Sequence, residues 1–151
     1  MSTTQIDRET FVITFERKLS ASREEVFDAW TRPEQIAEWW DPSGTRLLEC
    51  RVDLRPGGAF HFANVGHSPP FTGTYSLIER PAKLTFEALG SVGTVTLERM
   101  GDATHMRVTI RCASREHLEQ FIELGVAKNT DRTLDNLVAH VGARRSASHA
   151  P

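Results

Sequence analysis

The chain has 151 residues, of which 39% are hydrophobic and 25% are charged, a composition typical of a soluble globular protein of one domain. Its 18 basic and 20 acidic side chains give a formal net charge of −2, so no general attraction to nucleic acid or to an anionic membrane is expected. No apolar run approaches the about 20 residues that span a bilayer, and the N-terminus lacks the hydrophobic core of a signal peptide. We therefore expect a cytoplasmic protein with one domain over residues 10–141 and flexible tails at 1–9 and 142–151.

The cysteines and histidines form no recognisable metal-binding pattern. Cys50 and Cys112 each lie in a strand-like stretch outside any C-x-x-C motif, so we expect two buried, reduced thiols. The histidines show neither H-x-x-x-H nor H-x-H spacing, and His61 and His105 fall on the solvent side of their strands. We expect no metal and no intrinsic cofactor.

The N-terminal part of the chain predicts one strand followed by two short helices. Residues 11–19 are rich in β-branched and aromatic side chains, which is typical of a strand. The sequence Ser22-Arg-Glu-Glu25 is a capping box, which favours a helix that starts there and ends before Pro33. Proline suits the first position of a helix, so a second short helix is expected over 33–39.

The adjacent pair Trp39-Trp40 closes this second helix. Neighbouring residues on a helix cannot both face inward, so we expect one indole to pack and the other to border an opening. Packing is favoured for Trp39, and the alternative is that both indoles anchor the short helices to the sheet.

The middle of the chain alternates apolar and polar residues, which predicts strands. Short polar turns separate these stretches, so they form an antiparallel meander, with the strand at 11–19 added at one edge. The six expected strands are 48–54, 59–64, 71–79, 83–89, 92–100 and 105–112.

The C-terminal part predicts one long helix over 114–141, capped by Ser114. An apolar stripe on this helix needs a cover, and one face of the meander needs the same. We therefore expect an α+β fold in which a curved antiparallel sheet of about seven strands wraps around the C-terminal helix.

The stripe on the long helix is interrupted halfway. Gly125, Asn129, Thr130 and Thr133 fall on its sheet-facing side, opposite strand positions rich in aromatic residues. Small and polar residues facing aromatic ones predict an apolar cavity with a few polar anchors, the usual form of a small-molecule site. The expected lining is Trp40, Phe60, Phe62, Tyr75, Phe86, Phe121 and Val126, with Asn64, Asn129, Thr130 and Thr133 as polar anchors. The alternative is that neighbouring side chains fill this space.

No linear motif for catalysis is present. The chain has no nucleophile elbow, phosphate-binding loop or dinucleotide fingerprint. The acidic pairs Glu24-Glu25 and Asp131/Asp135 are interpreted as solvated helix faces. An enzyme stays open as an alternative, because a Tyr, Asn or carboxylate in a cavity can transfer protons without any linear motif.

Several short motifs, in order, resemble one known family. They are Phe27-Asp-Ala-Trp-Thr-Arg-Pro-Glu34, Trp39-Trp40 before Pro42, Asp53-Leu-Arg-Pro-Gly-Gly58 with Phe60 and Phe62, Gly73-Thr-Tyr75 and Leu134-Asp-Asn-Leu137. Together they resemble the activator of heat-shock protein 90 ATPase-like family, within the START-like (SRPBCC) helix-grip superfamily, over about residues 10–141. The resemblance implies a curved sheet that grips a C-terminal helix around a deep cavity. Many relatives carry Gly-Trp where this chain has Asn129-Thr130, which implies a cavity of different volume and polarity.

The resemblance leaves three functions open. The first is a single-domain protein that binds a hydrophobic or aromatic small molecule between sheet and helix. The second is a co-chaperone-like interaction protein of the stress response, for which a chaperone is the partner. The third is an enzyme of the cyclase or hydrolase kind that uses the cavity. Monomer and homodimer both remain open, because nothing in the edge strands decides between them.

Overall fold

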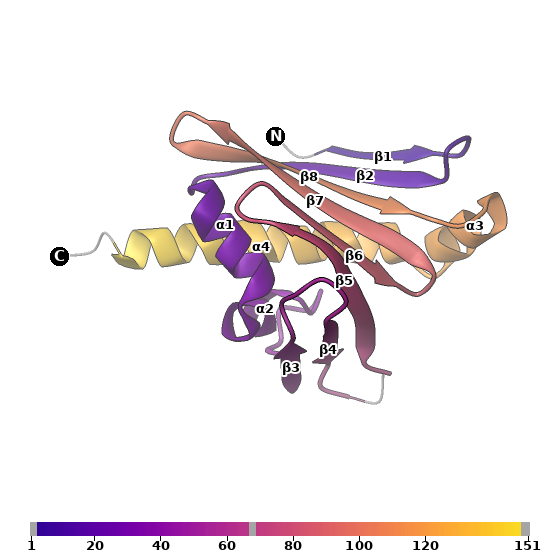
Figure 1. Cartoon of the computed structure of the whole chain (residues 1–151), viewed down its shortest axis with the longest axis horizontal. Helices are drawn as coiled ribbons and strands as arrows, with labels where there is room; N and C mark the ends of the chain where they lie inside the picture. The colour runs from indigo at the N-terminus through magenta and orange to yellow at the C-terminus, as the bar shows by residue number, and fades with distance from the viewer. Residues whose placement is uncertain (1–2, 67–68, 149–151) are drawn as a thin grey trace.

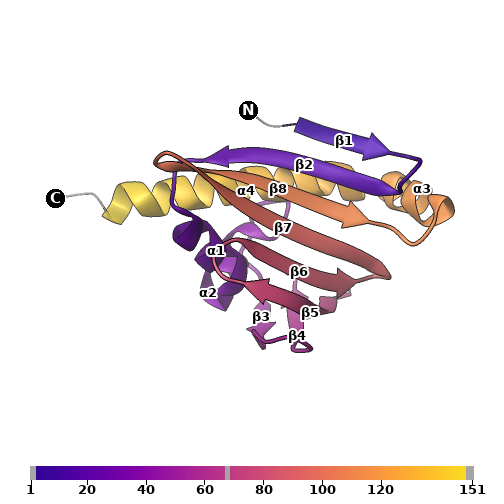
Figure 2. The same cartoon turned by 45° about the horizontal axis from the view of Figure 1, so that its top comes forward.

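The chain folds into an antiparallel sheet with helices on one face (Figure 1). The structure is a computed structural model that describes residues 3–66 and 69–148, with side chains up to Arg144. The sheet order is β1-β2-β8-β7-β6-β5-β4-β3, and every pair of neighbours is antiparallel. The long last helix runs along one face of this sheet in both views (Figures 1 and 2). The predicted α+β architecture is confirmed.

The predicted meander is present with small shifts at its ends. The strands are β2 (Val12–Leu19), β3 (Glu49–Val52), β4 (Ala59–Ala63), β5 (Phe71–Glu79), β6 (Lys83–Ala88), β7 (Ser91–Met100) and β8 (Ala103–Arg111). β2 pairs with β8 along its whole length, so the strand expected over 11–19 lies beside the last strand of the meander. The strand expected over 48–54 shortens to β3, and the Leu48 residue is 73% exposed.

An eighth strand, β1 (Thr3–Asp7), lies in the segment that was expected to be a flexible tail. It pairs with β2, with Thr3 opposite Glu16 and Asp7 opposite Val12. All five β1 residues are exposed, so the strand has no buried apolar face. Backbone hydrogen bonds to β2 hold it, and the Thr4 side chain adds one to Asp131. Without a buried apolar face the sequence carries no alternating signal.

The two short helices form as expected. In α1 (Arg23–Thr31) the Glu25 amide donates to Ser22 Oγ at 3.2 Å, and the Ser22 amide donates to Glu25 Oε1 at 3.2 Å. In α2 (Pro33–Trp39) the proline occupies the first turn. Trp39 is 1% exposed and its Nε1 donates to the Ala29 carbonyl at 3.0 Å, so this indole joins α2 to α1.

The C-terminal helix was predicted to be continuous over 114–141, and this was wrong. It consists of α3 (Arg115–Glu123) and α4 (Val126–Ser148), which also runs beyond the expected boundary at 142. The chain turns at Gly125, whose φ of 78° lies in the left-handed region that glycine adopts at low cost. The Gly125 carbonyl then accepts from the Asn129 amide at 2.8 Å, which begins the hydrogen-bond ladder of α4.

The β2 strand holds α4 through a buried arginine. Arg17 is 4% exposed and lies on the inner face of the sheet. Its Nη2 is 2.8 Å from Asp131 Oδ1 and its Nε is 3.3 Å from Asp135 Oδ1. Thr4 Oγ1 donates to the same Asp131 oxygen at 2.6 Å. The interpretation of Asp131/Asp135 as a purely solvated face was therefore wrong, because the β1–β2 edge brings an arginine against them.

Candidate functional site

A hollow of about 300 Å³ lies between the first turns of α4 and the inner face of the sheet. Its lining is mostly apolar and comes from α1, from the segments after α2 and β4, from strands β5 to β8, and from α3 and α4. Its aromatic lining residues are Trp30, Trp40, Phe71, Phe86 and Phe121. Ligand pockets in proteins have volumes of about 300–1,000 Å³, so this hollow is large enough for a small organic molecule.

The position of the hollow follows from small residues on both of its walls. On α4, Asn129, Thr130 and Thr133 take the places where a continuous apolar stripe would carry large side chains. On β7, Gly93 lies opposite Phe86 of β6. A Cβ on Gly93 would come within 2.5 Å of the Phe86 ring, so the ring lies directly over this glycine. The missing side chain lets the aromatic ring lie against the sheet.

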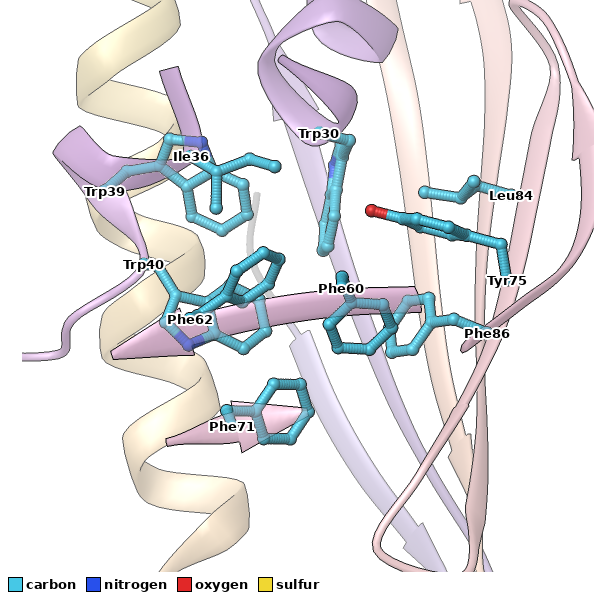
Figure 3. Close-up of a pocket in the computed structure, with 10 residues that line it drawn as sticks. All are labelled: Trp30, Ile36, Trp39, Trp40, Phe60, Phe62, Phe71, Tyr75, Leu84 and Phe86. Carbon is cyan, nitrogen blue, oxygen red and sulfur yellow. The ribbon is translucent and has the colours of Figure 1, made fainter. Parts of the chain in front are cut away.

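A second, smaller cavity of about 20 Å³ adjoins the first, and the two share Trp30, Trp40, Phe71 and Phe86 (Figure 3). Its remaining aromatic walls are packed against one another. The ring centroids of Phe60 lie 5.0 Å from Phe62 and 5.2 Å from Tyr75, within the usual range of aromatic contacts. A volume of about 20 Å³ has room for roughly one water molecule. On this side the aromatic side chains fill the space themselves.

The expected site residues therefore divide between the two cavities. Those that line the larger hollow are Trp40, Asn64, Phe86, Phe121, Val126, Asn129, Thr130 and Thr133. Phe60, Phe62 and Tyr75 line only the smaller one. Further lining residues were not expected from the sequence, among them Trp30, Phe71 and Ile110, because strand register and helix packing direct them inward and no local motif encodes either.

Two of the expected polar anchors, Thr133 and Asn64, form hydrogen bonds with the protein's own segment after α2. Thr133 Oγ1 donates to the Trp40 carbonyl at 3.0 Å. Asn64 Nδ2 donates to Asp41 Oδ2 at 2.7 Å, and Asn136 Nδ2 donates to the Asp41 carbonyl at 3.0 Å. These three bonds tie the segment after α2 to α4 and to the end of β4. They fix Trp40 in the wall between the two cavities.

The other two expected polar anchors, Asn129 and Thr130, do not form such bonds within the described protein. Among the described residues, the side chains of Asn129 and Thr130 donate no hydrogen bond to another protein group and accept none, and both line the larger hollow. Asn129 is exposed and Thr130 is half-buried, so they lie where the hollow meets solvent. They are therefore two polar side chains at the edge of the hollow whose hydrogen bonds the fold does not use.

The titratable groups near the smaller cavity favour their neutral forms. Burial raises the pKa of Tyr75, and the nearby Cys50 raises it further. Burial likewise raises the pKa of Cys50 to about 11, with a smaller contribution from the Glu34 charge. Neither group therefore supplies an anion near pH 7. Within residues 3–66 and 69–148, no cluster of histidine, cysteine or acidic residues is arranged to hold a metal ion.

A curved antiparallel sheet closed on one face by a long C-terminal helix defines the helix-grip class of proteins. The family model described as activator of Hsp90 ATPase homolog 1-like protein matches residues 20–142. The chain belongs to this family, and the resemblance seen in the sequence is confirmed. None of the curated proteins matches the chain significantly.

Solved structures share the fold at low sequence identity. A protein from Nitrosomonas europaea has a TM-score of 0.83 at 19% identity, over 93% of this chain and 99% of that one. A protein from Mycobacterium smegmatis has a TM-score of 0.82 at 18% identity, over 95% and 99%. CalU16 from Micromonospora echinospora has a TM-score of 0.68 at 24% identity, over 97% and 90%. These similarities show the START-like helix-grip fold. In the part of the chain that the structure describes, no helix has the length and apolar character needed to cross a membrane.

Proposed function

We propose that this protein binds a hydrophobic or aromatic small molecule in the hollow between the sheet and α4. The observation that carries the proposal is a mostly apolar space of about 300 Å³ beside well-packed aromatic rings. A concave, mostly apolar space of this size with a few polar groups at its edge is the usual form of a small-molecule site. Family membership supports the same function, since proteins of this fold commonly bind hydrophobic ligands or act as co-chaperone-like proteins.

The test begins with native mass spectrometry of the purified protein, followed by thermal-shift measurements against aromatic metabolites, polyketides and lipids. A ligand present at 100 times its Kd stabilises the folded state by about 2.7 kcal/mol, which raises the midpoint of a domain of this size by several degrees. A co-purifying mass, or a saturable rise in midpoint, is the expected result.

Thr130→Trp places a bulky side chain in the hollow and is expected to abolish binding while the fold is retained. Lys128→Trp is the matched control, because it adds the same side chain at an exposed position of the same helix. Unchanged affinity in Thr130→Trp would contradict this placement of the ligand. No bound mass and no thermal shift, with a normal cooperative melt, would contradict the proposed function.

The co-chaperone-like function is the second candidate, and family membership favours it. An exposed Trp39 or Trp40 would be a suitable aromatic anchor for such an interface. Trp39 is buried and Trp40 is half-buried against Phe62 and Phe71, so neither indole is a fully exposed anchor. Exposed aliphatic side chains do occur, with Leu89 at 64% and Leu124 at 74% exposure. A pull-down that retrieves a chaperone from wild type but not from a Leu124→Ser variant would favour this function, because Leu124 does not line the hollow, whereas Leu89 does.

A further inference from the structure

Deepening the function proposed above, and resting on it, we propose that the ligand is an uncharged aromatic molecule of about two-ring size, hydrogen-bonded by Asn129 and Thr130. The proposal rests on four features of the larger hollow: its volume, its aromatic walls, the charges around it and the polar groups left unused by the fold.

The volume sets the size of the ligand. An apolar cavity of about 150 Å³ in a protein core accommodates one benzene molecule. The hollow here is about 300 Å³, twice that volume, so two fused or linked rings fit. Because the hollow opens to solvent beside Asn129 and Thr130, a much larger molecule would extend out through that opening.

The walls present aromatic rings from several elements. Trp40 follows α2, Phe71 begins β5, Phe86 lies on β6, and Phe121 lies on α3. The Trp40 and Phe71 rings lie 5.1 Å apart at 37°, and Figure 3 shows them on the same side of the neighbouring cavity. Ring surfaces in different orientations favour stacked and edge-to-face contacts, which an aromatic ligand makes better than an aliphatic one.

The charges disfavour an ionised ligand. Within the described part of the chain, none of the residues that line the hollow has an ionisable side chain. Ionisable residues contact the lining from behind: Asp41 accepts a hydrogen bond from Asn64, and the His117 ring lies 4.5 Å from the Phe121 ring. Partial burial acts to raise the pKa of Asp41, but hydrogen bonds from Ser43 and Asn64 outweigh it and hold the pKa below its usual value. The carboxylate is therefore ionised at neutral pH and repels an anion, and any ionised ligand would lose its hydration without gaining a counter-charge.

The unused polar groups give the ligand its orientation. Thr133 and Asn64 donate hydrogen bonds to Trp40 and Asp41, as described above. Asn129 and Thr130 have no such bond within the described residues, and each side chain can both donate and accept a hydrogen bond. They are the fourth and fifth residues of α4, and they lie where the hollow opens to solvent. A hydroxyl, carbonyl or amide on the ligand would meet them there, with the rings directed inward.

Three probes of similar shape separate these features: naphthalene, 2-naphthol and 2-naphthoate. Affinities are measured by titration of tryptophan fluorescence and checked by calorimetry at pH 7. We expect 2-naphthol to bind two- to tenfold more tightly than naphthalene, the contribution of about one net hydrogen bond. We expect 2-naphthoate to bind at least about tenfold more weakly than 2-naphthol, because its charge is buried without a partner.

Variants then assign the polar contact. Asn129→Ala with Thr130→Val is expected to remove the advantage of 2-naphthol while leaving naphthalene affinity within about twofold. Lys128→Ala, at an exposed position on the same helix, is the control and is expected to keep the wild-type ratio.

Two sets of results separate this inference from the function on which it rests. Equal binding of 2-naphthoate and 2-naphthol, or an unchanged ratio in the double variant, would overturn the inference. The proposed function would still stand if naphthalene binds and Thr130→Trp excludes it. Failure of all three probes would overturn the inference, and failure of the wider ligand screen as well would overturn the proposed function.

Discussion

The hydroxyl of Thr133 donates a hydrogen bond of 3.0 Å to the backbone carbonyl of Trp40, a residue 93 positions earlier in the chain. This bond joins the middle of α4 to the end of α2 and sets the wall between the two cavities. A residue that the sequence offered as a ligand anchor is thus part of the frame of the site. Its neighbour Thr130, one turn earlier on the same helix, lines the larger hollow and has no such bond within the described residues.

Substitution of these two threonines distinguishes a residue that stabilises the fold, Thr133, from one whose side chain makes no bond within the described protein, Thr130. Thr133→Val removes the bond to Trp40 and leaves a carbonyl without its partner, so we expect the free energy of unfolding to fall by about 1–2 kcal/mol. Thr130→Val removes no protein–protein bond and is expected to stay within about 0.5 kcal/mol of wild type. Urea denaturation measures both. An equal loss in the two variants would contradict the assignment.

Much of the frame could be predicted because its signals are local. The capping box at Ser22, the proline that starts α2 and the alternation of the meander each act within a few residues, and all three appear as expected. β1 could not be predicted, because its pairing uses backbone groups and its side chains are all exposed. The inward position of Phe71 depends on strand register, and the roles of Asn64 and Thr133 depend on contacts with a segment that is distant in sequence.

The ion pairs of Arg17 also depend on contacts between segments distant in sequence. They predict which of two aspartate substitutions costs more stability. Asp131 is the nearer and more buried partner, with 35% of its side chain exposed, and Asp135 is 68% exposed. Asp131→Asn weakens the closer ion pair of a buried guanidinium, so we expect a loss of about 1–3 kcal/mol in the free energy of unfolding. Asp135→Asn removes a solvated partner and is expected to cost about 0–1 kcal/mol. Denaturation at low salt gives both values, and a larger loss in Asp135→Asn would contradict this order.

The break between α3 and α4 gives a pair of glycine substitutions with opposite signs. Gly125 has a φ of 78°, where a Cβ is strained, so Gly125→Ala is expected to destabilise the fold by about 1–2 kcal/mol. Gly142 lies inside α4, and a Cβ there meets no atom within 4 Å. Gly142→Ala is therefore expected to stabilise the protein by about 0.5–1 kcal/mol. Thermal melts of the two variants should move in opposite directions, and a shared direction would refute the argument.

His140 of α4, which contacts Gln35 of α2, is expected to make the stability of the protein depend on pH. Burial, and then the positive charge of Arg144, lower the pKa of His140 below its usual value of 6.5. Its Nε2 lies 3.1 Å from Gln35 Oε1, in a half-buried contact. Because the folded state binds this proton less readily than the unfolded state, the stabilisation is complete above pH 6.5 and is lost as the pH falls through the folded pKa.

We therefore expect the free energy of unfolding to decrease between about pH 7.5 and 5, with a smaller decrease in His140→Gln. The other histidines stay in both proteins, so the difference between the two pH profiles isolates this residue. Urea titrations at intervals of half a pH unit measure it. Profiles that run parallel would show that His140 titrates alike in the folded and unfolded chain, against the burial of its ring beside Gln35.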